Sequence, residues 1–317
     1  MPTSLVTGAA GFIGSNLVQH LLEHDHTVVA LDNLSTGRAG NLEDVSDVIT
    51  FVEGDVRDRA LMTELCAGVD FVFHQAALPS VPRSIDKPWA ANAHNVNGTL
   101  SVFLAARDTD VRRVVFAVSS SVYGDTDQLP KQETMCPQPR SPYAVSKHVG
   151  ELYGAVFSDV YDIETVGLRY FNVFGPRQDL SSDYAAVIPK FIDLLRREEP
   201  PVIHGDGEQT RDFTYVENVV QANRKAAQAS SEDVSGEIFN VGCGDRVTVN
   251  RLAQTLKDII DTDTEPVHGE PRPGDVRHSQ ADIQKARDAF GYNPQVGLRE
   301  GLRRTVEWFE TIQVETS

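Results

Sequence analysis

The residues best suited to chemistry in this chain are a tyrosine and a lysine four positions apart, Tyr143 and Lys147. Pro142 precedes the tyrosine, as is typical of the first turn of a helix, so both side chains are predicted to lie on one helix face. A phenol, with a pKa of about 10, can act as a base near neutral pH only when its phenolate is stabilised. A lysine cation one turn away supplies that stabilisation, so the pair predicts proton transfer.

Three consecutive serines, Ser119, Ser120 and Ser121, follow an apolar strand predicted at 113–118. Ligands of open α/β sheets bind at the carboxyl ends of the strands, so these hydroxyls are predicted to lie beside the ligand. A tyrosine and lysine at this spacing are, on their own, more often a solvated pair on a helix surface. The serines and the glycine motif described next favour the catalytic interpretation.

A glycine-rich turn near the N terminus indicates a dinucleotide site. The sequence Thr7-Gly8-Ala9-Ala10-Gly11-Phe12-Ile13-Gly14 follows an apolar strand and opens an amphipathic helix. Gly8 allows the tight turn, Gly11 lets the backbone approach a pyrophosphate, and Gly14 lets the helix pack close to the strand. The unpaired N–H groups and the positive end of the helix dipole attract phosphate. The alternative is a purely structural glycine turn.

Asp32, at the end of the second predicted strand, favours NAD over NADP. An acidic residue at this point receives the hydroxyls of the adenosine ribose and repels a 2′-phosphate. Arg38, in the loop that follows, could offset part of that repulsion. The further cofactor contacts predicted in this loop are Asn33, Ser35, Thr36 and Gly37.

The elements that position these residues alternate between short apolar strands and helical patterns. Strands are predicted near 3–7, 27–32, 48–52, 70–74, 113–118 and 163–168, and helices near 12–24, 58–66, 89–107 and 143–160. Such alternation predicts an α/β fold with a Rossmann-like, doubly wound parallel sheet and right-handed crossovers.

Beyond about residue 170 the pattern loosens into segments punctuated by proline and glycine. Helices are predicted there near 184–197, 215–229, 249–261, 281–289 and 298–311. We therefore expect an NAD-binding domain over 1–170, to which the chain returns around 212–241, and a smaller α/β substrate domain over 171–317.

The formal net charge of −17 argues against binding to nucleic acid or to anionic membranes, whose phosphates would be repelled. The acidic residues are spread along the chain, which indicates either a surface adapted to strong salt or an ordinary acidic cytosolic protein. There is no apolar run long enough to span a bilayer and no signal segment, so we expect a cytoplasmic location. The three cysteines are distant from one another and predict neither a disulfide framework nor a metal site.

Taken together, the quoted motifs resemble those of the extended short-chain dehydrogenase/reductase superfamily over essentially the whole chain. Within it they are similar to the nucleotide-sugar 4-epimerases that act on UDP-galactose and UDP-N-acetylglucosamine. The resemblance implies reversible inversion at C4 of a UDP-hexose through a transient 4-keto sugar, with NAD retained and regenerated. It implies that Tyr143 is the general base, that Lys147 lowers the pKa of Tyr143 and holds the nicotinamide ribose, and that Ser119 hydrogen-bonds the reacting oxygen. Ser120 and Ser121 could share that last role.

The resemblance also implies further ligand contacts. For the cofactor they are Asp55 and Val56 at the adenine, Ala76 and Asn95 in the channel, and Tyr170 near the nicotinamide. For the substrate they are the phosphate contacts Asn172, Arg211 and Arg272, Val187 at the uracil, and Asp275 and Ser279 near the hexose. One residue departs from the pattern: Pro79 stands where galactose-type epimerases usually carry a lysine, which puts one cofactor phosphate contact in doubt.

In the resembling family, a tyrosine at the position of Ser279 closes the hexose pocket to a 2-acetamido group. The small serine therefore predicts activity on UDP-GlcNAc and UDP-GalNAc, with UDP-Glc and UDP-Gal also accepted. The alternative for Ser279 is a cap on the helix predicted from about residue 281.

Other enzymes of the resembling superfamily differ from 4-epimerases at identifiable positions. Dehydratases usually carry an Asp-Glu pair where this chain has Ser120-Ser121, so dehydration and decarboxylation are disfavoured. A UDP-uronic-acid 4-epimerase stays open, as does an NAD-sensing regulatory module without catalysis. The resemblance finally implies a homodimer formed by the helices near 89–107 and 143–160.

Overall fold

A seven-stranded, fully parallel sheet forms the centre of the protein. The computed structural model describes residues 1–179, 186–271 and 276–315, with side chains up to 311. Within these ranges the strand order is β3-β2-β1-β4-β5-β6-β11. The strands are β1 (Thr3–Thr7), β2 (Thr27–Asp32), β3 (Thr50–Glu53), β4 (Phe71–His74), β5 (Arg113–Ser119), β6 (Glu164–Tyr170) and β11 (Glu237–Val241).

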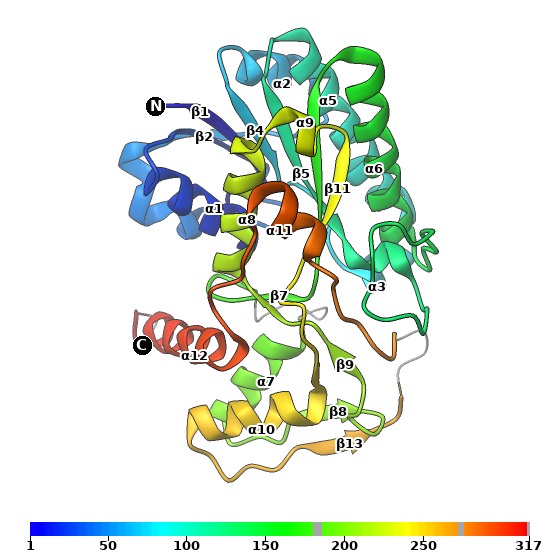
Figure 1. The fold of residues 1–317 in the computed structure, drawn as a ribbon. Helices are drawn as coiled ribbons and strands as arrows, with labels where there is room; N and C mark the ends of the chain where they lie inside the picture. Colours follow the sequence, from blue (N-terminus) through cyan, green and yellow to red (C-terminus); the bar gives the residue numbers. More distant parts are fainter. Residues whose placement is uncertain (180–185, 272–275, 316–317) are drawn as a thin grey trace.

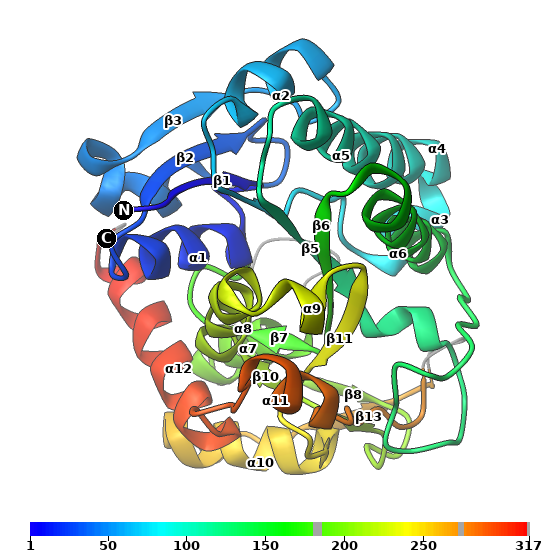
Figure 2. The ribbon, with the colours of Figure 1, turned by 45° about the horizontal axis from the view of Figure 1, so that its top comes forward.

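The inner strands are apolar on both faces because helices cover both sides of the sheet. In β4 and β5, residues such as Phe73, Val114 and Val115 are fully buried. Helices α2 (Arg59–Cys66), α5 (Gly98–Asp108) and α6 (Pro142–Tyr161) cover one face, and α1 (Phe12–Leu22) and α8 (Val216–Gln228) cover the other (Figure 2). The predicted doubly wound α/β fold is confirmed.

The strand order reverses between β1 and β4, which makes this the switch point of the sheet. Crossovers lead away from it in opposite directions, so a crevice opens at the carboxyl ends of these two strands. Helix α1 begins at this edge, directly after β1. The topology therefore places the glycine turn and the serines that follow β5 at the same edge.

Most of the C-terminal part of the chain lies below this carboxyl edge in Figure 1, whereas its helix α11 (Gln284–Phe290) packs against β11. The C-terminal part contains α7 (Val187–Arg196), α10 (Val249–Ile260), α11 and α12 (Leu298–Glu315), together with three small sheets. The small sheets pair β7 (Val173–Phe174) with β10 (Thr214–Tyr215), β8 (Val202–His204) with β13 (Val267–Gly269), and β9 (Thr210–Arg211) with β12 (Val247–Thr248). Between these elements the chain returns to the large sheet, where β11 pairs with β6.

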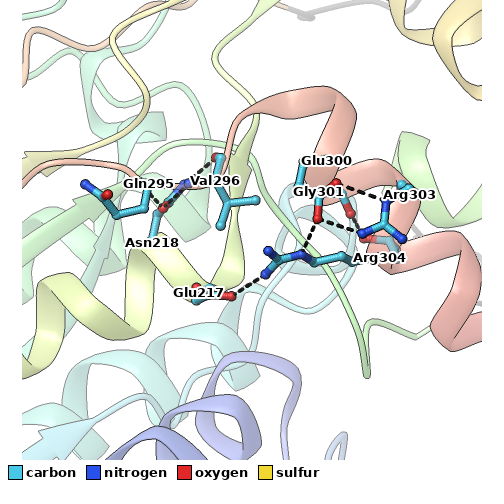
Figure 3. A network of polar contacts seen from close by, with 9 residues as sticks. Glu217, Asn218, Gln295, Val296, Glu300, Gly301, Arg303 and Arg304 are labelled. Atoms are coloured by element: carbon cyan, nitrogen blue, oxygen red, sulfur yellow. Dashed lines mark hydrogen bonds and ion pairs between the residues drawn. The ribbon is translucent and has the colours of Figure 1, made fainter.

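Helix α12 is fixed to α8 by the polar network shown in Figure 3. The buried Asn218 donates to the carbonyl of Val296 and accepts from the N–H groups of Gln295 and Val296. Arg304 joins Glu217 of α8 to Glu300 of α12 through bonds of 2.8 and 2.7 Å. These bonds fix the loop before α12 and the first turns of that helix.

Most predicted elements are present, and the differences have local causes. The helix predicted near 89–107 is a run of α4 (Pro88–Asn92), a π-helical segment η2 (Ala93–Asn97) and α5. A short helix, α3 (Val81–Asp86), was not predicted, because its signal is only a capping serine, Ser80, and a proline in the first turn. None of the helices in the described ranges is both long and apolar enough to cross a membrane.

Candidate active site

A groove of about 800 Å³ runs along the carboxyl edge of the sheet, within the size range of ligand sites. It brings together the glycine turn after β1, the loop after β2, the segment after β4, and the N-terminal half of α6. Among the residues predicted from sequence, its lining includes Gly8, Gly11, Phe12, Ile13, Gly14, Asp32, Asn33, Ser35, Thr36, Gly37, Val56, Ala76, Tyr143, Lys147 and Tyr170.

The glycine turn leaves no space for side chains. Gly8 has φ of +68°, and a Cβ there would lie 2.7 Å from the backbone nitrogen of Ala76. A Cβ on Gly14 would lie 2.0 Å from the carbonyl oxygen of Gly8, so α1 can pack this close to the turn only with glycine at that position. Gly11 is the N-cap of α1 and has no side chain to cover the free N–H groups of the first turn. The turn thus leaves those groups available to an anion.

Asp32 fixes the glycine turn and faces the groove. Its carboxylate accepts from the N–H groups of Ala10 at 2.9 Å and Leu34 at 2.8 Å. Burial raises the pKa of Asp32, and these backbone hydrogen bonds oppose the rise. The same oxygens can accept hydrogen bonds from ribose hydroxyls, so this location is compatible with the predicted role of Asp32.

Asp55 is placed by hydrogen bonds on the adenosine side. Asn33 donates to it at 2.9 Å, and Arg57 forms two bonds with the same carboxylate. Arg57 holds the pKa of Asp55 well below its usual range. Val56 lines the groove directly, whereas Asp55 orients Asn33.

Helix α6 carries Tyr143 and Lys147 into the groove. Ser141 caps the helix by accepting from the N–H of Ala144 at 3.1 Å, and Pro142 occupies its first turn. Tyr143 faces Ser119, which lies at the end of β5 and acts to lower the pKa of the Tyr143 phenol. Lys147 is buried, and its Nζ donates to the carbonyl of Ala117 at 2.9 Å. The structure thus joins the three residues that the spacing of the sequence singled out.

Burial is the largest influence on the pKa values of Tyr143 and Lys147. Burial raises the pKa of Tyr143, and the hydrogen bond with Ser119 lowers it only in part. Burial also lowers the pKa of Lys147 to about 8. The ammonium group of Lys147 is directed at Ala117 and desolvation dominates both groups, so the lowering of the Tyr143 pKa by Lys147 stays a prediction.

Three other predicted residues have supporting positions. Asn95 is buried and holds the loop at Leu78, accepting from its N–H at 2.7 Å, so it lies behind the channel instead of lining it. Ser121 donates its backbone N–H to Ser119 Oγ at 3.2 Å, which orients the Ser119 hydroxyl. Ser120 and Ser121 belong to the short helix η3 (Ser120–Tyr123), where the chain no longer continues in the direction of β5. Ser119 is the serine that contacts Tyr143.

A smaller cavity of about 190 Å³ lies beneath the groove, between α7 and the small sheets. Its lining includes the predicted substrate contacts Asn172, Val187 and Arg211, and Arg211 Nη1 donates to the carbonyls of Thr210 and Arg277. Asp212, next to Arg211, is fully buried and accepts from the N–H groups of Cys243, Gly244 and Ala281. Burial raises the pKa of Asp212 to about 6. This carboxylate therefore ties together the loops around Arg211.

The remaining predicted substrate contacts lie near this cavity or outside the described residues. Ser279 is buried beside β9, where its N–H donates to the carbonyl of Thr210 at 3.1 Å. It does not cap a helix, since α11 begins at Gln284 with Ile283 as its N-cap. Arg272 and Asp275 fall outside the described residues.

Sequence reasoning missed several residues at the site. Arg83 and Arg177 both line the large groove, which Pro79 also lines in place of the usual lysine. Arg83 is four residues after Pro79, a helical spacing that could have indicated it. Arg177 has φ of +69° and follows Gly175-Pro176, and neither feature predicts where its side chain points.

A buried ion pair behind Lys147 was also missed. Glu151, one turn further along α6, accepts two bonds from Arg169 at 2.6 and 2.9 Å. The guanidinium group of Arg169 lies 4.7 Å from the ring centre of Tyr123, in η3. This unit fixes the catalytic helix against β6 and the segment that carries the serines. The sequence signal for Glu151 is its position four residues after Lys147, which continues the spacing of Tyr143 and Lys147 along one helix face.

The residues present fit a dinucleotide. The glycine turn offers free N–H groups for the pyrophosphate, Asp32 faces the place of the adenosine ribose, and Tyr143 and Lys147 line the far part of the same groove. No cluster of three or more histidine, cysteine, aspartate or glutamate side chains in the described parts of the chain could hold a metal ion.

Comparisons with known proteins agree with this assignment. The model of the NAD dependent epimerase/dehydratase family matches residues 4–242. A UDP-glucose 4-epimerase of Mycolicibacterium smegmatis is 42% identical over 311 residues, covering 96% of this chain and 98% of the relative. The solved UDP-N-acetylglucosamine 4-epimerase of Methanobrevibacter ruminantium, in complex with UDP-N-acetylmuramic acid, has a TM-score of 0.94 and 41% identity, covering 98% and 99% of the two chains. The UDP-glucose 4-epimerase of Thermus thermophilus, solved with NAD, has a TM-score of 0.87 and 33% identity, covering 97% and 99%.

Proposed function

The chain belongs to the NAD-dependent epimerase/dehydratase family, and from that premise we propose which sugars this UDP-sugar 4-epimerase converts. It uses NAD, as the extended short-chain dehydrogenases do. The proposed reaction is the interconversion of UDP-GlcNAc and UDP-GalNAc, with UDP-Glc and UDP-Gal accepted as smaller substrates. The observation that carries the proposal is the contact of Tyr143 with Ser119, beside Lys147, in the groove that begins at the glycine turn.

The chemistry is divided between the cofactor and the side chains. When bound, NAD supplies the hydride acceptor and donor, and its positively charged nicotinamide ring favours a phenolate nearby. Tyr143 is placed to take the proton of the sugar 4-hydroxyl and to return it after inversion. Ser119, whose hydroxyl is oriented by the N–H of Ser121, supports the reacting oxygen. The 4-keto sugar turns over between the two halves of the reaction, so that the same cofactor serves both.

The smaller cavity supports a UDP-linked substrate. Arg211 lines it and presents a planar fork suited to a diphosphate, and Asn172 and Val187 lie around the same space. The loop that carries Arg211 is held in place by Asp212 through three backbone bonds. We therefore place the diphosphate near Arg211, with the hexose directed toward Tyr143.

Ser279 supports the proposal that acetamido sugars fit. It lies beside Thr210, next to Arg211 on β9, and its side chain is much smaller than the tyrosine that closes the pocket in the resembling family. Replacing Ser279 with Tyr should abolish turnover of UDP-GalNAc and UDP-GlcNAc while sparing UDP-Gal, because a steric wall excludes the larger group strongly. Proton NMR of the anomeric region, after incubation with each UDP-sugar in turn, measures the outcome.

Ser279→Thr is the matched control, since it adds one methyl group and leaves the acetamido sugars as substrates. Turnover of UDP-GalNAc by Ser279→Tyr at the parent rate would remove Ser279 from the role of gatekeeper. Failure of the unmodified protein to convert any of these four sugars would contradict the proposed function itself.

A UDP-uronic-acid 4-epimerase is the second candidate. Its substrate would need one more cationic contact at the hexose, and Arg83 lines the groove that also holds Tyr143. The same NMR panel includes UDP-glucuronic acid, whose faster conversion would favour this candidate. Dehydration and decarboxylation are not favoured, because the positions after Ser119 carry Ser120 and Ser121 instead of carboxylates.

We also propose that the protein is a homodimer through α6. Four apolar side chains, Val145, Leu152, Val156 and Val160, form an exposed stripe along this helix. Their spacing of seven and four residues keeps them on one helix face, and a second copy can pack the same stripe against itself about a two-fold axis. Trp89, 85% exposed at the start of α4, extends the apolar surface. A single monomeric species in sedimentation equilibrium at micromolar concentration would contradict this arrangement.

A further inference from the structure

The segment that follows β7 crosses from the substrate side of the molecule to the dinucleotide side. It leaves β7, which pairs with β10 in the C-terminal part of the fold, and reaches α1. The carbonyl of Pro176 accepts from Asn16 Nδ2 at 3.1 Å, and Arg177 donates to the Gln19 side chain at 3.1 Å. Arg177 also donates to the carbonyl of Ser15 and lies 3.8 Å from Asp44. The segment is thus held against the side of α1.

The segment ends in an ion pair with the loop after β2. Arg38 Nη2 lies 2.6 Å from Asp179 Oδ1. Arg38 follows β2, which lies on one side of the switch point, whereas Asp179 follows β6 and β7 on the other side. Both residues line the large groove, as do Arg177 and Gln178. The ion pair therefore connects the two sides of the cofactor groove at the end where the adenosine is predicted to bind.

An ion pair at this place can affect how fast a bound dinucleotide dissociates. The loop from Asn33 to Arg38 would border the adenosine ribose of a bound dinucleotide, and the glycine turn would hold its pyrophosphate at the start of α1, the helix that the segment contacts. The ion pair joins the two sides of the groove that would hold the dinucleotide, so exit at this end would require Arg38 and Asp179 to separate. We propose that the Arg38–Asp179 pair, supported by Arg177, is a latch that slows the release of NAD. The proposal rests on the use of NAD but on no choice of sugar, so it can fail without affecting the proposed function.

The strength of the latch follows from its exposure. The side chains of Arg38 and Asp179 are 62% and 42% exposed, so water and salt screen their attraction. Exposed pairs of this kind contribute about 0.2–1 kcal/mol, which corresponds to a change of up to about fivefold in a rate constant. The latch therefore tunes the lifetime of bound cofactor without making it permanent.

Asp179→Asn is the decisive variant, because two explanations predict opposite results. NAD is an anion, so removal of a negative charge beside the groove should slow its release if only direct attraction to the cofactor matters. Loss of the latch should instead speed release, by up to about fivefold. The measurement is the dissociation rate constant of NADH from the loaded protein, followed by the loss of its fluorescence after mixing with excess NAD.

Two further variants complete the test. The charge-reversed double variant Arg38→Asp/Asp179→Arg should return the dissociation rate to that of the parent, because it remakes the pair. Arg303→Gln, which removes an exposed paired arginine on α12 (Figure 3), should leave the rate unchanged. All these side chains are exposed, so equal melting temperatures are expected and serve as a check on folding.

The dissociation rates of the two variants decide whether the latch exists. Faster release from Asp179→Asn together with recovery in the double variant supports the latch. Release from Asp179→Asn that is unchanged or slower overturns it. Release from the double variant that stays as fast as from Asp179→Asn also overturns it, because the effect would then not depend on the pair.

Discussion

Replacing Tyr143 with Phe is expected to lower kcat by about 10²–10⁴-fold on every UDP-sugar that the protein converts. The substitution removes the hydroxyl that contacts Ser119 and keeps the ring that lines the groove. Proton transfer to and from the 4-hydroxyl then has no positioned group. Binding of NAD and the melting temperature should change little, because the hydroxyl is a small part of the contact surface. Initial rates with UDP-Gal and UDP-GalNAc measure the effect.

Tyr161→Phe is the matched control, since Tyr161 ends the same helix α6 and is 43% exposed, far along the helix from the groove. It should turn over at the parent rate. Near-normal turnover in Tyr143→Phe would remove Tyr143 from its proposed role. A large loss of NAD in that variant would instead assign the residue to cofactor binding.

Replacing Gly14 with Ala is expected to abolish the retention of NAD. A Cβ at this position would lie 2.0 Å from the oxygen of Gly8, 2.8 Å from its carbonyl carbon and 2.9 Å from the Cα of Ala9. All three atoms are backbone, so the clash can be relieved only by moving α1 away from the turn. Overpacking of this kind costs about 1–3 kcal/mol, and here it also displaces the N–H groups aimed at the pyrophosphate. NAD released on denaturation of the purified protein, measured per chain, gives the result.

Gly150→Ala is the control for the change itself. Gly150 also lies inside a helix, but the nearest atom to a Cβ there is Thr99 Cγ2, at 3.8 Å. The substitution should be neutral or stabilise the fold by up to about 1 kcal/mol, since alanine favours helix more than glycine does. Parent-like NAD content in Gly14→Ala would show that the close approach of α1 to the turn is not needed for the cofactor.

The fold was predictable because its signals are local and repeated. Strands such as β4 and β5 are short apolar runs, and each helix between them follows the 3.6-residue pattern, which leaves a parallel sheet as the consistent arrangement. The glycine turn, Asp32, and the Tyr143 and Lys147 pair were predictable for a related reason. Each depends on spacing within one element, or on the rule that ligands gather at the carboxyl edge.

The features that could not be predicted from the sequence depend on contacts between distant segments of the chain. Asn95 is a residue type that often contacts ligands, but its side-chain amide oxygen instead accepts a hydrogen bond from the backbone N–H of Leu78. The bridge from Arg38 to Asp179 joins residues 141 positions apart, and no pattern in either loop predicts it. The raised pKa of Tyr143 depends on how much of the side chain is enclosed, which only the packed structure shows. Burial and pairing are tertiary properties, and they decide the roles of these residues.

The central claim is that one retained nicotinamide both takes the hydride from C4 and returns it to the same sugar. The most direct measurement uses UDP-GalNAc and UDP-Gal that carry deuterium at C4, incubated with the purified protein in ordinary water without added cofactor. Mass spectrometry and proton NMR of the epimer report the label at C4. We predict that the product keeps its deuterium and that no NADH accumulates during turnover. Loss of the label to solvent, or conversion that requires added NAD in stoichiometric amount, would contradict the account.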